Sequence, residues 1–109
     1  MTWTTLKEEV EIELPHLTLT GKVEYDPGLQ ALTITDTTTG EEEVLSVNLT
    51  DYGYIAFPGE VFVKDWSEHQ GLPAALEQAG IATVKAPITV GPFASTAYRM
   101  RLNGQEEAQ

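Results

Sequence analysis

The sequence contains no cysteine among its 109 residues. This absence excludes disulfide bonds, metal sites built from thiolates and catalysis by a cysteine nucleophile. No apolar run approaches the ~20 residues that a membrane-spanning helix needs. The first residues also lack the basic and then apolar segments of a secretory signal peptide. We therefore expect a cytoplasmic protein that does not associate with a membrane.

Positively charged residues are scarce, with 6 lysines and arginines against 17 aspartates and glutamates and a formal net charge of −11. Residues 1–54 hold most of the imbalance, because they carry 11 acidic residues and 2 lysines, a net charge of −9. Such a surface repels phosphate groups, so direct binding to nucleic acid is not expected. A basic protein surface is its natural complement, although acidity also keeps small domains soluble.

The acidic residues are regularly placed in residues 6–14, where they alternate with aliphatic residues. The three glutamates of this ladder are Glu9, Glu11 and Glu13. Alternation predicts a strand with one buried aliphatic face and one face of carboxylates about 6.8 Å apart. The ladder suits a positively charged partner, but charged residues on an edge strand also discourage aggregation between sheet edges.

The remaining pattern predicts an α+β fold in a single domain, residues 1–104, followed by a frayed polar tail, residues 105–109. We expect a five- or six-stranded, mainly antiparallel sheet with one short helix, about residues 69–79, packed on one face. The predicted strands cover residues 6–14, 17–25, 32–34, 44–49, 61–63 and 97–102. The first four of them should form a meander, whereas residues 81–90, interrupted by Pro87, are expected to be a connecting segment.

The helix carries the usual start and stop signals. Ser67 or a residue just after it can cap the N-terminus, Pro73 suits the first turn and Gly80 ends the helix. Such a short amphipathic helix is marginal in water alone, so its apolar stripe must pack on the sheet.

Chemistry-bearing residues form one small cluster, Asp65, Glu68 and His69. A metal site or a general base needs such groups to converge, and an enzyme or metal protein built on Asp65 and His69 is one alternative. Interaction with the helix N-terminus is the simpler explanation of Asp65 and Glu68. Because no catalytic or cofactor motif accompanies them, we expect a protein that is not an enzyme and binds no metal or cofactor.

Two further features are candidates for partner binding. Glu41, Glu42 and Glu43 follow a predicted hairpin tip, where they are either a solvated turn or an extension of the acidic face. Tyr52 and Tyr54 lie in a loop beside a glycine, where tyrosines either anchor the loop or provide contact area.

The second half of the chain resembles a domain-of-unknown-function family of small proteins from conjugative elements and phages of Gram-positive bacteria. The similar features span about residues 47–102: Val47-Asn48-Leu49, Gly59-Glu60-Val61-Phe62-Val63, a short helix from Leu72 to Leu76 ending at Ala79-Gly80-Ile81, and Gly91 before a tyrosine-bearing strand. The resemblance implies a genetic context, since accessory genes of mobile elements often encode small acidic inhibitors of host defence, including anti-CRISPR proteins and DNA mimics.

The sequence thus favours a small acidic binding protein that engages a basic surface of a nucleic-acid-binding protein. The residues expected to carry this role are Glu9, Glu11, Glu13, Glu41, Glu42, Glu43, Tyr52 and Tyr54. The alternative is a structural or assembly protein that forms a homodimer, either through the loop from Tyr52 to Phe57 or through an edge strand.

Overall fold

The structure is a computed structural model that describes residues 3–15, 17–66, 69–92 and 94–103 of the chain. These residues form seven β-strands, one α-helix and one 3₁₀ helix. In chain order the elements are β1 (Thr4–Leu14), β2 (Leu17–Asp26), β3 (Ala31–Thr35), β4 (Glu42–Val44), η1 (Thr50–Tyr52), β5 (Glu60–Lys64), α1 (Leu72–Gln78), β6 (Ala82–Val90) and β7 (Ser95–Leu102).

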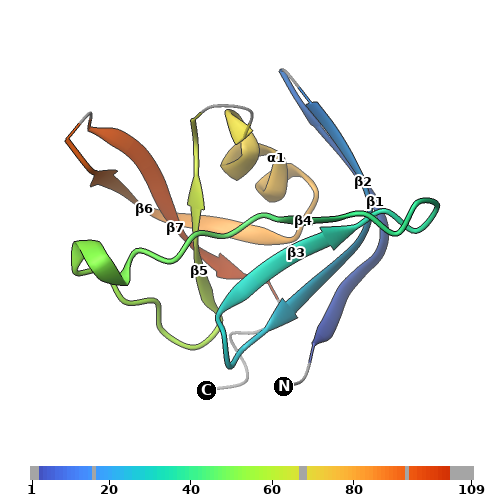
Figure 1. Ribbon diagram of the computed structural model, residues 1–109, viewed down its shortest axis with the longest axis horizontal. Coiled ribbons are helices and arrows are strands. Elements are labelled where there is room, and N and C mark those ends of the chain that lie inside the picture. The colour runs from blue at the N-terminus through green and yellow to red at the C-terminus, as the bar shows by residue number, and fades with distance from the viewer. Residues whose placement is uncertain (1–2, 16, 67–68, 93, 104–109) are drawn as a thin grey trace.

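The strands form two antiparallel sheets, which face each other around one core (Figure 1). The first sheet has four strands in the order β1-β2-β3-β4, and the second has three in the order β5-β7-β6. The predicted combination of antiparallel strands with one short helix is confirmed. The single sheet of five or six strands is wrong, because β5 pairs with β7 and not with β4.

The first sheet is the predicted meander, and its turns are stabilised by aspartates. The carboxylate of Asp26 accepts hydrogen bonds from the backbone amides of Gly28 (2.8 Å) and Leu29 (3.3 Å). In the same way, Asp36 accepts a hydrogen bond of 2.7 Å from the amide of Thr38. Aspartate side chains that bind the backbone in this manner define the turn and so fix the pairing of the strands on either side.

Gly21 marks the point where β2 leaves β3 and continues with β1 alone. Its φ of +146° is one that other residues rarely adopt, and a Cβ at this position would overlap the carbonyl oxygen of Thr35. Beyond this point the β1–β2 hairpin extends past the sheet and lies next to α1 (Figure 1). Because Gly21 has no side chain, the backbone at Thr35, the end of β3, can lie close against β2 at the point where the β1–β2 hairpin extends toward the helix.

The segment after β4 connects the two sheets. The amide of Leu45 donates a hydrogen bond to the Leu32 carbonyl (2.7 Å), and that of Val47 donates to the Phe62 carbonyl in β5 (2.8 Å). The strand expected over residues 44–49 is therefore misplaced, since β4 ends at Val44 and the chain then changes sheets.

Residues 81–90 were expected to be a connecting segment, but Ala82–Val90 forms strand β6. β6 pairs only with β7, so it is an edge strand. Proline is tolerated at an edge because the ladder there needs no hydrogen-bond donor on the open side. Pro87 thus marks an edge strand and does not interrupt the sheet.

Helix α1 begins after Gly71 and ends before Ala79, so it is shorter than the predicted 69–79. Pro73 lies in its first turn, as expected. No side chain caps its N-terminus; instead Asp65 accepts a hydrogen bond of 2.6 Å from the amide of Gly71, just outside the helix. The capping roles considered for Ser67 and Glu68 lie outside the described residues.

The main core fills the space between the sheets and α1. It includes inward residues of both sheets and the helix residues Leu72 and Leu76, which are fully buried. A second, smaller cluster around Phe62 and Ala97 lies on the opposite face of the β5-β7-β6 sheet, under residues 47–56. Among the described residues, no helix is long and apolar enough to cross a membrane.

We predict that Gly21→Ala lowers the free energy of unfolding by roughly 2–4 kcal/mol, because it adds backbone strain to a steric overlap. Chemical denaturation of the purified variant measures this loss. Gly40→Ala is the matched control, since Gly40 also has positive φ (+81°) but a Cβ there meets nothing within 4 Å. Equal losses of unfolding free energy in the two variants would contradict the close backbone contact between Gly21 of β2 and Thr35 of β3.

Candidate functional site

Charge is divided between the two sheets. Strands β1 to β4 contain eight acidic residues and two lysines, a net charge of −6. Strands β5, β6 and β7 contain one acidic residue, Glu60, and four basic residues, a net charge of +3. The acidity of the N-terminal half is therefore concentrated on one sheet, and that sheet's outward face is the candidate interaction surface.

Glu11 and Glu13 stand on the outward face of β1. Ile12 between them is buried in the core, whereas both glutamates are exposed. Across the strand pair they lie opposite the exposed residues Thr20 and Thr18 of β2. The alternation therefore gives these two carboxylates the orientation expected from the sequence.

Glu9 is exposed but has a different environment from the other two residues of the ladder. The pairing of β1 with β2 is irregular between Lys7 and Val10, so the simple alternation does not continue through Glu9. Its Oε1 atom accepts a hydrogen bond of 3.2 Å from the hydroxyl of Thr37, in the β3–β4 turn. This contact brings the first glutamate of the ladder next to the turn that precedes the second acidic cluster.

The three consecutive glutamates of this second cluster do not form one surface. Glu42 lies opposite Thr35 and is exposed, and Glu41 precedes the strand and is also exposed. Glu43 lies opposite the buried residue Ile34 and so faces inward. Alternation along a strand separates neighbouring side chains onto opposite faces, which adjacency in the sequence does not show.

Glu43 is occupied by an internal contact with His69. Its Oε2 atom lies 2.8 Å from Nε2 of His69, whose side chain is only 5% exposed. Since a carboxylate only accepts hydrogen bonds, Nε2 is the donor. The pair joins β4 to the segment between β5 and α1, so it has a structural role and leaves Glu43 less free to bind a partner.

Asp65 and His69 have different hydrogen-bond partners, and Glu68 lies outside the described residues. Asp65 binds the amide of Gly71, and His69 binds Glu43. Within the described part of the chain, no group of three or more histidine, aspartate or glutamate residues is arranged to hold a metal ion.

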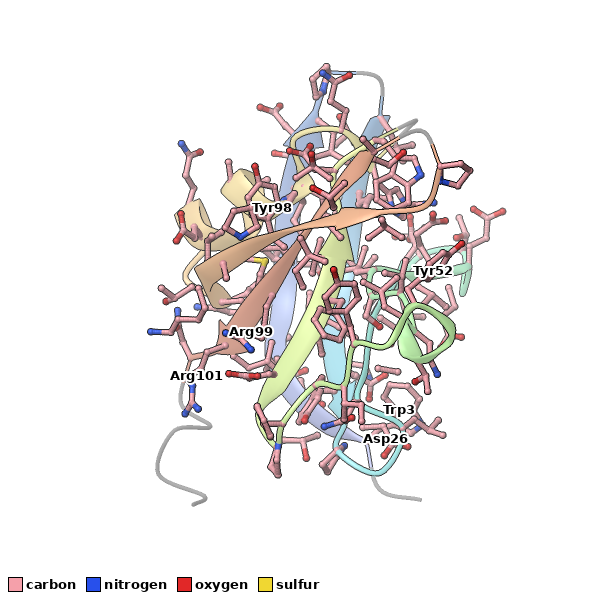
Figure 2. All side chains as sticks on the ribbon, turned by 90° about the vertical axis from the view of Figure 1, so that its left-hand side faces the viewer. Trp3, Asp26, Tyr52, Tyr98, Arg99 and Arg101 are labelled. Carbon is pink, nitrogen blue, oxygen red and sulfur yellow. The ribbon has the colours of Figure 1, made fainter. Side chains whose placement is uncertain are left out.

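The two candidate tyrosines have different surroundings. The ring of Tyr54 packs edge-on against Phe62, with 6.2 Å between the ring centroids, and is half-buried. Tyr52, in η1, is 55% exposed and lies at the surface in Figure 2. Tyr54 therefore anchors the loop, and Tyr52 is the one available for contact.

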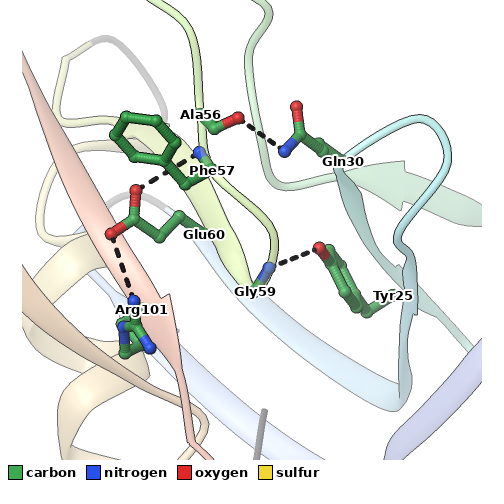
Figure 3. A network of polar contacts seen from close by, with 7 residues as sticks. All are labelled: Tyr25, Gln30, Ala56, Phe57, Gly59, Glu60 and Arg101. Atoms are coloured by element: carbon green, nitrogen blue, oxygen red, sulfur yellow. Dashed lines mark hydrogen bonds and ion pairs between the residues drawn. The ribbon is translucent and has the colours of Figure 1, made fainter. Parts of the chain in front are cut away.

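An apolar groove next to this loop was missed by the sequence prediction. Leu29, Val44 and Ile55 line it, and its volume is about 190 Å³. The side-chain amide of Gln30 donates a hydrogen bond of 2.6 Å to the Ala56 carbonyl, which ties the loop to the β2–β3 turn (Figure 3). Ile55 is 71% exposed and nearby Phe57 is 59% exposed. The run of apolar residues in a loop was the available signal, but only the register shows that Val44 faces outward.

Comparison with protein-family models, with curated proteins and with solved structures finds no match. The surfaces described above are therefore interpreted from their own geometry.

We predict that His69→Ala lowers the free energy of unfolding by roughly 1–3 kcal/mol, because it removes a buried side chain and its hydrogen bond to Glu43. Thermal and chemical denaturation measure the loss. Glu43→Gln, which keeps an acceptor oxygen, should cost less, and Glu42→Gln on the exposed face should change stability little. A destabilisation by Glu42→Gln as large as that by His69→Ala would contradict this assignment.

Proposed function

We propose that this chain is a small, non-enzymatic binding protein whose acidic sheet engages a basic surface of a nucleic-acid-handling protein. The observation that carries the proposal is the display of Glu11, Glu13 and Glu42 on the outward face of one sheet. The sequence resemblance to proteins of mobile elements suggests the biological setting. In that setting the chain would act as an inhibitor of a host defence protein, of the anti-CRISPR or DNA-mimic type.

A rigid acidic face is suited to such a partner for a physical reason. Proteins that grip nucleic acid present lysine and arginine side chains to a regular array of phosphates. Here strand pairing fixes the backbone positions that carry the outward glutamates, so no backbone ordering is needed on binding and the entropic cost is that of the glutamate side chains. Among the described ion pairs on this face, Lys22 neutralises only Glu24, at 3.6 Å. The other outward glutamates remain available.

The surface that we propose for binding is narrower than the set expected from the sequence. Glu9, Glu11, Glu13 and Glu42 are exposed on the first sheet and Glu41 is exposed just before β4, whereas Glu43 is paired with His69. Tyr52 adds exposed aromatic area on a neighbouring loop. The interaction should therefore depend on β1 and on the outward side of β4.

One observation favours a second function, that of a self-associating structural or assembly protein. Large apolar side chains are exposed on the turn after β2, on β4, in η1 and on the loop before β5, and Leu29, Val44 and Ile55 among them line one groove. They are Leu29, Val44, Tyr52, Ile55 and Phe57. An exposed apolar patch of this kind is typical of a protein interface.

If the chain forms a homodimer through this patch, Ile55→Asp should shift the oligomer to monomer, because a carboxylate cannot be buried unpaired. Light scattering with size-exclusion chromatography at several protein concentrations measures the state. A dimer held by apolar contact should persist at high salt. A monomer at every concentration would remove this second function.

For the acidic face, we predict that Glu11→Gln with Glu13→Gln weakens binding to the basic partner by about tenfold or more, because two charge-assisted contacts are lost. The partner is first isolated from a lysate of a Gram-positive bacterium, with washes at low and high salt, and then titrated by calorimetry.

The control is Thr83→Lys with Thr89→Lys, which changes the net charge by the same amount at exposed positions of β6, on the second sheet. It should retain most of the affinity. If the two variants bind alike, net charge and not the acidic face accounts for binding.

A further inference from the structure

One edge of β2 is open over the first residues of the strand. β2 pairs with β1 from Leu17 onward, whereas its pairing with β3 starts only at Lys22, opposite Thr35. Among the described residues, no strand pairs with residues 17–20 on that second side. The open edge belongs to the part of the β1–β2 hairpin that extends past the sheet in Figure 1.

The register shows which backbone groups face the open edge. The amide and the carbonyl of Leu32 both bond to the segment after β4. Backbone groups alternate between the two sides of a strand, so Thr35 faces β2 and its partner Lys22 faces β3. The same alternation turns the amides and carbonyls of Thr20 and Thr18 to the side that β3 has left.

A groove of about 190 Å³ lies against this edge. Thr18 and Thr20 line it and have exposed side chains, whereas Leu19 between them is buried. Leu17 and Ile34 add apolar lining. An open strand edge beside a groove is the arrangement that binds an extended peptide, because the edge bonds to its main chain and the groove takes alternate side chains.

The groove also has an acidic wall, formed by residues of the β3–β4 turn and of β4. They are Asp36, Glu41, Glu42 and Glu43. Asp36 is used by its turn and Glu43 by His69. Within the described part of the chain, neither Glu41 nor Glu42 takes part in an ion pair. The open backbone groups therefore lie beside negative charge that no neighbouring cation offsets.

The glutamates of β1 lie close to the same edge. Glu13 and Glu11 are opposite Thr18 and Thr20 in the β1–β2 pair. A strand added to β2 would lie two strand spacings from β1, which is about 10 Å. An extended lysine or arginine side chain and a glutamate side chain can together span that distance.

We propose that the basic partner docks through an extended, positively charged segment that adds a strand to the open edge of β2. The amides and carbonyls of Thr18 and Thr20 would bond to the main chain of this segment, and its basic side chains would meet the surrounding carboxylates. A second copy of this chain is a poor occupant, since it would bring two acidic edges together. The inference rests on the proposed function, because it states how the partner of the acidic sheet binds.

The experiment is a titration of the full ¹⁵N-labelled chain with a short synthetic peptide of alternating lysine and valine residues. Amide spectra give the affinity, and hydrogen exchange shows whether the amides of Thr18 and Thr20 become protected. The control probe is the same peptide with every backbone amide N-methylated, which keeps the charges but cannot pair as a strand. We expect saturable binding of the first peptide with slower exchange of both amides, and binding of the control that is weaker by about tenfold or more.

Two substitutions at one position test the edge itself. Thr18→Pro removes an edge amide but no charge, so the affinity for the peptide should fall by about tenfold. The β1–β2 pairing should tolerate this proline, because the amide of Thr18 faces away from β1. Thr18→Val keeps the amide and should bind as the native chain does. Thr20→Pro with Thr20→Val repeats the comparison if Thr18→Pro loses the native backbone spectrum.

The outcomes separate strand addition from the role of the acidic face. Strand addition is overturned if the N-methylated peptide binds as tightly as the unmodified one, or if a folded Thr18→Pro variant keeps the native affinity. Weaker binding by Glu11→Gln with Glu13→Gln in that case leaves the acidic-face proposal standing. A loss of affinity in Thr18→Pro but not in the glutamine variant supports strand addition and removes the role of Glu11 and Glu13.

Discussion

The arrangement of the two sheets depends on the segment Leu45–Val47, where the amide of Leu45 bonds to β3 and the amide of Val47, two residues later, bonds to β5. The crossing lets one apolar core serve both sheets, since each contributes its inward face. A buried hydrogen bond of 3.1 Å from the Gly59 amide to the Tyr25 hydroxyl reinforces the connection (Figure 3). Each sheet keeps a separate outward surface, because both turn their inward faces to the same core. The division of charge between the strands therefore places acidic and basic residues on different sides of the molecule.

The local elements could largely be predicted from the sequence. Alternation identified β1, and the aspartate and glycine turns identified the meander, because these signals act within a few residues. Pairing between distant strands could not be predicted in the same way. Nothing in the pattern of β5 shows that it pairs with β7, which follows it by thirty residues. Pro87 was misleading for a related reason, since its meaning depends on whether β6 is a central or an edge strand.

The candidate surface was predictable only where it depended on alternation. Glu11 and Glu13 face outward as their period requires, but Glu9 lies at an irregularity in the pairing, which the pattern of the strand does not reveal. Glu43 was grouped with its neighbours because they are adjacent in sequence, yet its contact with His69 spans 26 residues. The apolar groove was missed because it arises from register and from contacts between distant segments.

The separation of charge between the sheets gives the molecule a permanent electric dipole in addition to its net charge of −11. A charged partner exerts a torque on such a molecule as well as a force, so a positively charged surface turns the β1–β4 side toward itself during approach. At about 0.1 M salt this effect is confined to the last ~10 Å before contact. Encounters would therefore begin with the molecule already oriented, and that pre-alignment should raise the fraction of collisions that are productive.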